Sequence, residues 1–382
     1  MRAWLEISRA ALAANARAIG RLTGPARLCA VVKSNAYGHG LLSTARAISA
    51  SGVPGLGFGV FGAAEGLVLR SGGIAEPILV VGPVTDDELP DAVAADLELG
   101  LLDEADAVRF GRQRATVHVK VETGTGRFGL SPKAAAAAVT RLHELGSRVA
   151  GMYSHLADAE ELDAAFAREQ LARLIDVAGM ANSALEAAGY SQPTTSHSSP
   201  LQGSQPSRMP LHIAASAAAL MWPELRLDMV RCGIAMYGAW PSQSVRERMR
   251  EIAPTFVLER AMRFFAPIVH VFAIASGETV GYGCEFRAER ASRIAVLPVG
   301  YADGIPRAAG NGTFRVKVRN GYAPVVGRIC MNACMIDVTD CTPAPVRGDT
   351  AELDLEDLAT SAGTINYEIL ARLSPELDRR YA

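Results

Sequence analysis

A chain of 382 residues, of which 49% are hydrophobic, is long enough for one large barrel and a second domain. Its formal net charge of −2 gives no basic surface of the kind that binds nucleic acid or anionic membranes. We therefore expect its partners to be small molecules or a second copy of the chain.

The N-terminal segment and the cysteines bear on location and metal binding. Charges interrupt the apolar stretch of the first twenty residues, and no window of 18 residues is apolar and uncharged. We therefore expect neither a signal peptide nor a membrane span, and we expect a cytoplasmic protein. The six cysteines lack zinc-site spacing, so we expect no metal site and no disulfide. They are Cys29, Cys232, Cys284, Cys330, Cys334 and Cys341.

Residues 1–240 alternate short apolar runs with amphipathic runs about eight times. Eight strand–helix units in this length predict an α/β fold with a TIM-type (β/α)8 barrel, and a doubly wound open sheet is the competing architecture. Thr85 and Glu88 have capping-box spacing, and Ser131-Pro132 is typical of a helix start. The expected strands are 28–33, 55–60, 77–82, 97–102, 116–122, 148–154, 210–216 and 228–236.

The pattern changes in the second part of the chain. Residues 193–207, rich in Ser, Pro, Gln and Gly, indicate a flexible surface loop. Asn320-Gly321 is a strong hairpin-turn signal, and Asn366–Leu373 is expected to form a terminal helix. We therefore expect a mostly β domain over 241–382, and we leave open whether the first ten or so residues pair with it. Its expected strands are 264–274, 293–299, 314–318 and 322–326.

The candidate catalytic residues follow the expected barrel strands, where parallel barrels place their chemistry. Lys33 ends the first strand, and a partly desolvated lysine can lose its proton and attack carbonyl groups. Barrels commonly bind phosphate after strands seven and eight, where Ser216 and the amides of Gly233 and Ile234 fall. Each residue alone also fits an ordinary structural role, such as a core histidine or a turn glycine. The other candidates at this end are Arg127, His155, His212 and Arg231.

Long motifs occur in a fixed order along nearly the whole chain. They are VVKSNAYGHG, VETGTGRFGL, SHLADAE, LHIAAS, RCGIAMYG, VGYG, VGYADGIPR, GRICMNACMID and TINYEIL. Together they resemble the motifs of the alanine racemase family. The resemblance implies a barrel that binds pyridoxal 5'-phosphate, a β domain, and a homodimer with active sites shared between subunits. It also implies interconversion of L-alanine and D-alanine, which supplies D-alanine for cell-wall precursors.

The same resemblance implies a two-base mechanism. Lys33 matches the lysine that carries the cofactor and acts as base for the D-enantiomer. Tyr282 matches the base for the L-enantiomer, which acts in the active site of the other subunit. Arg231 matches the residue that donates to the pyridine nitrogen of the cofactor. Because a guanidinium stays protonated, that nitrogen would stay unprotonated, and the ring would withdraw electrons less strongly.

Further positions match by motif. The expected phosphate-binding residues are Tyr37, Ser216, Gly233, Ile234 and Tyr367. The residues expected around the ring and Arg231 are His155 and His212. Those expected at the substrate carboxylate are Arg127 and the backbone of Met331, with Tyr301 at the substrate entrance. Lys120 matches a lysine that is carbamylated in some members of the family.

The sequence departs from the family pattern near the expected substrate pocket. Asn332 replaces the usual Asp, Ala215 replaces the usual Asn, and the 193–207 loop is longer than usual. The other departures are Glu122, Thr125, Asp158 and Glu160. They favour, as an alternative, a racemase with serine or broad amino-acid specificity.

Two other function classes remain as alternatives. One is a pyridoxal-phosphate decarboxylase on the same fold, but its characteristic cysteine motif is not found around Cys330 or Cys341. The other is a non-catalytic cofactor-binding protein, but such relatives resemble the barrel alone.

Overall fold

The computed structural model describes residues 2–190 and 209–382, and it divides into two compact units. The barrel unit consists of Ala10–Ala36 and Leu41–Glu259, apart from the undescribed residues. The β unit consists of the chain up to Arg9, Tyr37–Gly40 and Arg260–Ala382. The barrel unit thus ends at Glu259, and the first residues and Tyr37–Gly40 belong to the β unit. The expected loop at 193–207 lies outside the described residues.

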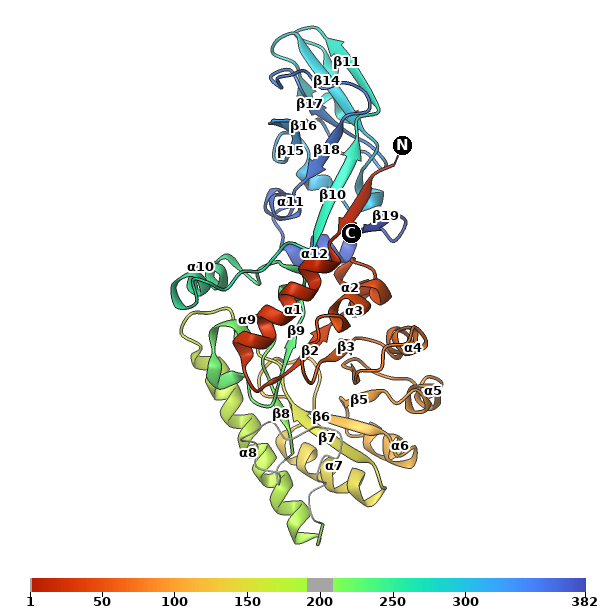
Figure 1. The fold of residues 1–382 in the computed structure, drawn as a ribbon, viewed down its shortest axis with the longest axis vertical. Helices are drawn as coiled ribbons and strands as arrows, with labels where there is room; N and C mark the ends of the chain where they lie inside the picture. Colours follow the sequence, from red (N-terminus) through yellow and green to blue (C-terminus); the bar gives the residue numbers. More distant parts are fainter. Residues whose placement is uncertain (1, 191–208) are drawn as a thin grey trace. The chain divides into compact units, whose positions relative to one another are not determined.

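The barrel unit is built around an eight-stranded parallel sheet with the order β8-β7-β6-β5-β4-β3-β2-β9 (Figure 1). Two backbone hydrogen bonds cross the remaining seam, from Asp228 to Leu211 (3.1 Å) and from Arg231 to Ala214 (2.9 Å). The predicted barrel is thus confirmed as nearly closed, and the open sheet is wrong. The strands are β2 (Arg27–Val31), β3 (Gly57–Val60), β4 (Ile78–Val80), β5 (Glu98–Leu101), β6 (Thr116–Lys120), β7 (Arg148–Tyr153), β8 (Leu211–His212) and β9 (Met229–Cys232).

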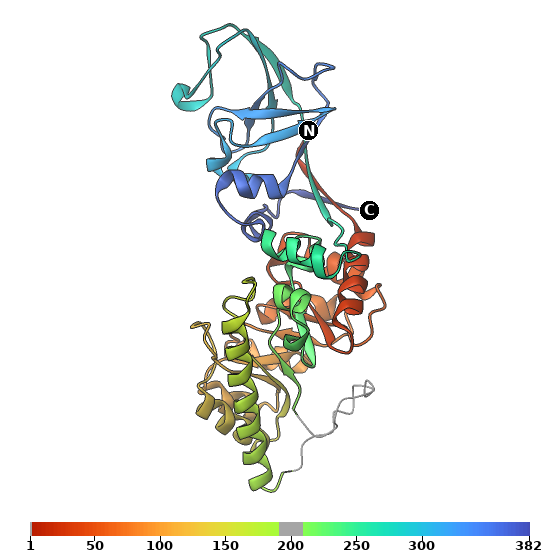
Figure 2. The ribbon, with the colours of Figure 1, turned by 90° about the vertical axis from the view of Figure 1, so that its left-hand side faces the viewer.

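Helices cover the outside of this sheet, and their capping follows the sequence signals (Figure 1, Figure 2). The Ser131 side chain accepts a hydrogen bond from the amide of Ala134 at the start of α7, and Pro132 follows it. Thr85 and Glu88 exchange hydrogen bonds before α5. The helices are α1 (Arg9–Thr23), α3 (Leu41–Ser49), α4 (Ala63–Ser71), α5 (Leu89–Ala94), α6 (Asp106–Arg112), α7 (Pro132–Glu144), α8 (Ala165–Ala187), α9 (Ser216–Met221) and α10 (Gln243–Ile252).

The β unit holds a nine-stranded sheet with the order β11-β14-β17-β16-β15-β18-β10-β1-β19. The predicted mostly β domain is therefore confirmed. Its strands are β1 (Trp4–Ile7), β10 (Met262–Pro267), β11 (His270–Ile274), β14 (Ser292–Leu297), β15 (Arg315–Val318), β16 (Gly321–Val326), β17 (Cys334–Asp337), β18 (Thr350–Leu353) and β19 (Asp378–Tyr381). The smaller elements are β12 (Thr279–Val280), β13 (Phe286–Arg287), α11 (Leu355–Ala362) and α12 (Asn366–Arg372).

Three details of the β unit go beyond or correct the sequence analysis. Strand β1 pairs antiparallel with β10 and parallel with β19, which answers the question left open about the first residues. The expected strand at 264–274 is two strands, β10 and β11. The predicted hairpin is present, but Val318 pairs with Gly321, so its turn is Arg319-Asn320 rather than Asn320-Gly321. Arg319 adopts the left-handed backbone, with φ of 51°.

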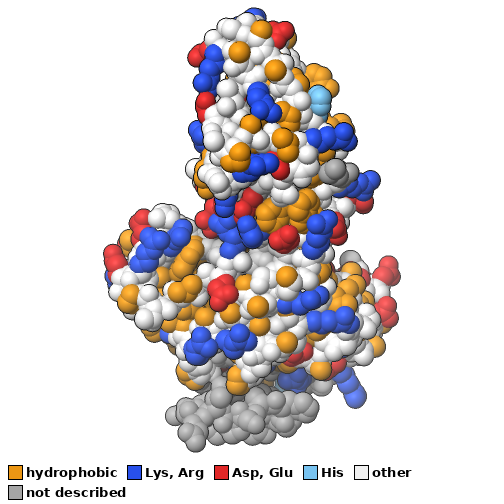
Figure 3. Space-filling view, turned by 45° about the horizontal axis from the view of Figure 1, so that its top comes forward, with side chains coloured by type: hydrophobic (Ala, Val, Ile, Leu, Met, Phe, Trp, Pro, Cys, Tyr) orange, Lys and Arg blue, Asp and Glu red, His pale blue; other side chains and the backbone are white. Residues whose placement is uncertain are grey.

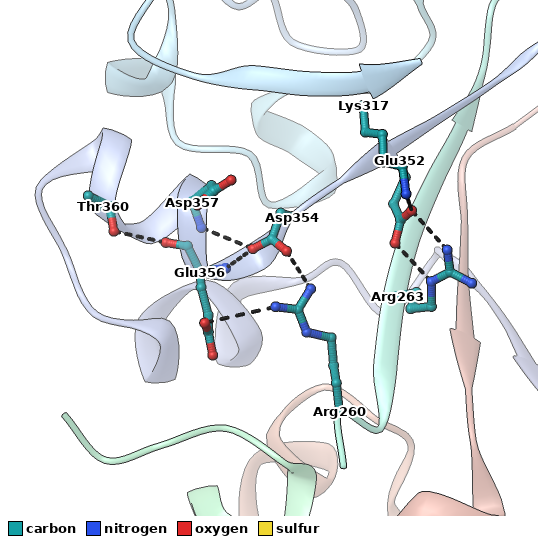
Figure 4. Close-up of polar contacts among 8 residues, drawn as sticks. All are labelled: Arg260, Arg263, Lys317, Glu352, Asp354, Glu356, Asp357 and Thr360. Carbon is teal, nitrogen blue, oxygen red and sulfur yellow. Dashed lines mark hydrogen bonds and ion pairs between the residues drawn. The ribbon is translucent and has the colours of Figure 1, made fainter. Parts of the chain in front are cut away.

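Ion pairs join neighbouring strands of the β unit (Figure 4). Arg263 on β10 donates twice to Glu352 on β18, at 2.8 Å each. Arg260 contacts Asp354, which also accepts hydrogen bonds from the amides of Glu356 and Asp357 and so caps α11. Exposed pairs of this kind each contribute about 0.2–1 kcal/mol to stability.

On the face drawn in Figure 3, basic and acidic side chains are interspersed with uncharged surface. This mixture fits the small net charge of the chain. Across the described ranges, we find no helix with the length and apolar character needed to cross a membrane.

Candidate active site

Lys33 lies two residues after the end of β2 and opens a strained turn, α2 (Lys33–Tyr37). Ser34, Asn35 and Ala36 have φ of 55°, 54° and 54°, a left-handed conformation that costs about 1–2 kcal/mol per residue. The Asn35 side chain stabilises the turn by accepting a hydrogen bond from the amide of Leu41 at 2.8 Å. Strain of this kind is typical of functional sites.

The environment of Lys33 favours its neutral amine. The side chain is half-buried, and this burial lowers the pKa of its ammonium group. The nearby Arg127 guanidinium lowers the pKa further, while Glu65 opposes the shift. A lowered pKa increases the fraction of Lys33 that can act as nucleophile or base at neutral pH.

Arg231, at the end of β9, is a buried cation that is only 5% exposed. Its Nη2 donates to the carbonyl oxygens of Ser154 (2.7 Å) and Ile213 (3.2 Å). Its Nη1 lies 2.8 Å from Nδ1 of His212, and Nη2 lies 3.4 Å from Nδ1 of His155. Among the described residues, no carboxylate lies within ion-pair distance of Arg231. The positive charge therefore remains available to a bound ligand.

His155 and His212 are kept neutral beside this cation. Burial, followed by the charge of Arg231, lowers the pKa of His155 to about 3. The same two causes lower the pKa of the fully buried His212 well below its usual value. Both imidazoles therefore carry one proton each at neutral pH and offer one nitrogen as acceptor.

The loop after β6 presents Arg127 at the surface of the barrel unit. The Glu122 carboxylate accepts hydrogen bonds from the amides of Gly124 (2.6 Å) and Arg127 (3.4 Å), and the Thr125 hydroxyl donates to the carbonyl of His155. These two departures from the family pattern thus shape the loop that carries Arg127.

Lys120 is buried at the end of β6, next to this loop. Its Nζ donates to the carbonyl of Phe128 at 2.8 Å. Burial, together with the charge of Arg127, lowers the pKa of Lys120 to about 8. A substantial fraction of this amine is therefore neutral near physiological pH.

Ser216 and the turn after β9 form a group of converging buried donors. The Ser216 Oγ accepts hydrogen bonds from the amides of Gly233 (3.1 Å) and Ala235 (3.4 Å). Within the described part of the chain, neither the Ser216 hydroxyl hydrogen nor the amide of Ile234 has an acceptor. Both residues are at least 96% buried, so these donors favour an anion at this position.

The remaining predicted site residues belong to the β unit. Tyr37 and Tyr367 lie with their ring centroids 6.2 Å apart. The backbone amide of Tyr301 donates to Cys330 at 3.1 Å, which places Tyr301 beside the segment of Met331. Tyr282 lies between β12 and β13 and is 70% exposed, so its phenol is available to a partner molecule. Met331 and Tyr301 are exposed as well, at 56% and 44%.

The sequence analysis missed three polar residues of the barrel interior, namely Glu98, His118 and Tyr153, of which His118 and Tyr153 are buried. A signal for His118 was present in the sequence TVHVK of β6. His118 and Lys120 lie two positions apart in a strand that is otherwise apolar, so both side chains point to the same face. Polar residues on one face of a buried parallel strand indicate a polar barrel interior.

Comparison with known protein families covers both units. Residues 7–241 match the model of the alanine racemase N-terminal domain, and residues 261–381 match that of the alanine racemase C-terminal domain. The chain is 36% identical over 392 residues to an alanine racemase from Desulforamulus reducens, covering 99% of this chain and 98% of that protein. It is 33% identical to one from Methanococcus maripaludis, covering 99% and 98%.

Solved structures agree. An alanine racemase from Streptomyces coelicolor A3(2) superposes with a TM-score of 0.86 at 31% identity, covering 100% of this chain and 98% of that one. An alanine racemase from Clostridium difficile 630 gives a TM-score of 0.86 at 29% identity, covering 100% and 96%. The chain therefore belongs to the alanine racemase family, and it is an isomerase of the racemase class.

Proposed function

We propose that this protein interconverts L-alanine and D-alanine with pyridoxal 5'-phosphate as cofactor, and that it supplies D-alanine for cell-wall precursors in the cytoplasm. The observation that carries the proposal is the composition of the barrel's carboxyl end. Three kinds of group follow neighbouring strands of one barrel there. They are the amine of Lys33, whose pKa is lowered, the buried cation of Arg231, and the donors of Ser216 and Ile234 that have no acceptor among the described residues.

The residues present fit this cofactor. Its phosphate needs hydrogen-bond donors, and the Ser216 hydroxyl and the amide of Ile234 supply them, with Gly233, Tyr37 and Tyr367 as further candidates. Its ring nitrogen needs a partner, and Arg231 is a fixed donor with no carboxylate beside it among the described residues. Its aldehyde needs a nucleophilic amine, and Lys33 has the lowered pKa for that role. His155 and His212 hold Arg231 in place.

When bound, pyridoxal phosphate supplies the electron sink that makes the α-hydrogen of an amino acid acidic. The protein then has to bind the substrate and move one proton. Arg127 binds the substrate carboxylate, with the backbone of Met331 as a second contact and Tyr301 at the entrance. Arg231 cannot give up its proton, so it keeps the ring nitrogen an acceptor, which favours reprotonation of the α-carbon over side reactions.

Racemisation requires one acid/base on each face of the α-carbon. Lys33 accepts the proton on the face that belongs to D-alanine, and Tyr282 acts on the face of L-alanine. We propose that Tyr282 acts in the active site of the partner subunit of a homodimer, since Tyr282 is 70% exposed.

A racemase of serine or of several amino acids is the second candidate. The residue after Met331 is Asn332, which is exposed and uncharged, where the family pattern has an acid. An amide can bind a substrate hydroxyl, and a site built to bind a hydroxyl discriminates against substrates that lack one.

Chiral chromatography of L-alanine and L-serine, incubated with the purified protein and pyridoxal phosphate, tests the proposal. We expect rapid formation of D-alanine and little D-serine. D-serine at or above the level of D-alanine would favour the second candidate. If neither D-amino acid formed while the protein bound the cofactor, the proposed substrate would be wrong.

A further inference from the structure

A hydrogen-bonded chain of four side chains crosses the interior of the barrel unit. It runs from Arg231 on β9 to His212 on β8, with 2.8 Å between Nη1 and Nδ1. Nε2 of His212 then lies 2.9 Å from Nδ1 of His118 on β6, and Nε2 of His118 lies 3.0 Å from Oε2 of Glu98 on β5. Arg231, His212 and His118 are at most 5% exposed.

The proton positions along this chain follow from its first member. A guanidinium N–H can only donate, so Nδ1 of His212 must accept. A neutral His212 then carries its proton on Nε2 and donates it to Nδ1 of His118. His118 must in turn carry its proton on Nε2 and donate it to Glu98. Every bond therefore points from Arg231 toward Glu98, and the ionised Glu98 carboxylate ends the chain as a pure acceptor.

The barrel is shaped to hold this chain. A Cβ atom at Gly151 would lie 2.8 Å from Nδ1 of His118, so only glycine leaves room for that ring. A Cβ atom at Gly100 would lie 2.7 Å from the hydroxyl of Tyr153. The Tyr153 ring stacks on His212, with centroids 4.8 Å apart and planes within 5°, which fixes the imidazole plane.

Glu98 is anchored as an anion at its end of the chain. Burial raises the pKa of the Glu98 carboxyl. The hydrogen bond from His118 and the nearby positive charges outweigh burial, and they lower this pKa to about 2. The basic groups that face it are His118, Arg27 and Arg148, the last with Nη2 at 3.5 Å from Oε1. A carboxylate is therefore present in the barrel interior at every physiological pH.

We propose that Glu98 and His118 are positioning residues, which fix the tautomer of His212 and thereby fix the guanidinium of Arg231, the residue that would hold the ring nitrogen of the cofactor. The role of the chain in catalysis rests on the proposed function. The tautomers themselves do not, because they follow from contacts within the barrel unit.

Nuclear magnetic resonance of the purified protein, labelled with ¹⁵N in its histidine rings, tests the tautomers with and without added pyridoxal phosphate. Long-range ¹H–¹⁵N spectra separate protonated from unprotonated ring nitrogens. We expect His118 and His212 to be neutral, each with its proton on Nε2 and a bare Nδ1. A proton on Nδ1 of His212, or a doubly protonated His118, would overturn the proposal, whatever activity the protein has.

Variants of Glu98 test the function of the hydrogen-bonded chain from Arg231 to Glu98. Glu98→Leu removes the final acceptor, and we expect the His118 and His212 resonances to change. We expect kcat to fall about tenfold, by analogy with the loss of the hydrogen-bond partner of a metal-bound histidine. Glu98→Gln keeps an acceptor oxygen, so we expect it to retain the wild-type tautomers and to rescue most of kcat. Arg148→Gln is the matched control, since it removes the other partner of Glu98 and leaves the chain intact.

Two results would contradict this role. One is a Glu98→Leu protein whose histidine resonances and kcat equal those of the wild type. The other is an Arg148→Gln protein that loses as much kcat as Glu98→Leu, because the effect would then be one of general stability. If Glu98→Leu does not fold, the wild-type spectrum and the Glu98→Gln variant still decide. A wild-type protein with the expected tautomers but no racemase activity would refute the proposed function alone.

Discussion

Arg263 in the β unit and Arg231 in the barrel unit use positive charge in opposite ways. In the β unit, arginines such as Arg263 lie directly against carboxylates, and the hydrogen bond to Glu352 raises the pKa of Arg263 (Figure 4). In the barrel unit, Arg231 is buried without a direct carboxylate partner among the described residues, and burial lowers the pKa values of Lys33 and Lys120.

The difference separates stability from function. A paired surface charge contributes modestly to folding free energy, and its carboxylate partner already neutralises the charge that a ligand would need. A buried cation whose charge is not neutralised directly costs folding free energy, and such a cost is typical of sites that bind an anion or polarise a substrate. Substitutions of the buried cations of the barrel unit should therefore affect chemistry more than stability.

The largest effect is expected for Lys33→Ala. We predict loss of covalently bound cofactor and a fall in racemisation of at least ~10³-fold, within the range that general acid–base groups contribute. The measurements are the visible absorbance of the purified protein with pyridoxal phosphate and the rate of D-alanine formation. A variant that still binds the cofactor covalently would show that another amine is the attachment site.

Tyr282→Phe tests whether the β unit contributes a catalytic base. Removing one phenolic oxygen should lower kcat by about 10²- to 10⁴-fold in both directions. Because the Tyr282 ring is 70% exposed, we expect the melting temperature to stay unchanged. Full activity in both directions would refute the two-base mechanism.

The pH dependence of stability sharpens the comparison. His155 has a pKa of about 3 in the folded protein, against about 6.5 for an unfolded histidine. Between these values the unfolded chain binds more protons, so the stabilisation is complete above pH ~6.5 and is lost as the pH falls toward ~3. The slope is at most about 1.4 kcal/mol per pH unit for one histidine.

Urea unfolding at several pH values measures this slope. His155→Gln should reduce this slope, because it removes a histidine whose pKa is lowered in the folded protein. His270→Gln, at an exposed position of β11 in the other unit, is the control, and we expect it to leave the slope unchanged. An equal slope for the wild type and His155→Gln would mean that His155 is not held neutral in the fold.

The smallest effect is expected for Glu352→Gln. It removes the partner of a half-exposed Arg263, so the free energy of unfolding should fall by about 0.2–1 kcal/mol. Racemisation should be unaffected. A loss of kcat/KM larger than the loss of stability would show that charge pairing in the β unit also serves the active site.

The sequence predicted the barrel well because each buried parallel strand is an apolar run followed by an amphipathic helix. All eight expected runs overlap strands β2 to β9. The hairpin turn was displaced by one residue, because register depends on the pairing of Val318 with Gly321 rather than on the Asn-Gly signal. The charged strand β19 was not predicted, since its only signal is its pairing with β1.

The site was predicted in part. Lys33 and Arg231 lie near the ends of strands and Ser216 begins the helix α9 after β8, positions that the order of elements along the chain indicates. In the left-handed turn after Lys33, the amide of Asn35 donates to Glu65 on α4 at 3.2 Å, and the hydrogen-bonded chain from Arg231 to Glu98 joins distant strands. Local sequence preference does not encode such contacts, and a lone Glu98 in a strand is indistinguishable from a surface residue.

The division of labour between the units can be tested by subunit complementation. Lys33→Ala and Tyr282→Phe chains, carrying different affinity tags, are co-expressed, and mixed dimers are purified by both tags. If Tyr282 acts in the active site of the partner subunit, each mixed dimer contains one site with both bases intact. We predict racemase activity in the mixed dimers and almost none in either parent. Mixed dimers that form but stay as inactive as their parents would contradict a shared active site.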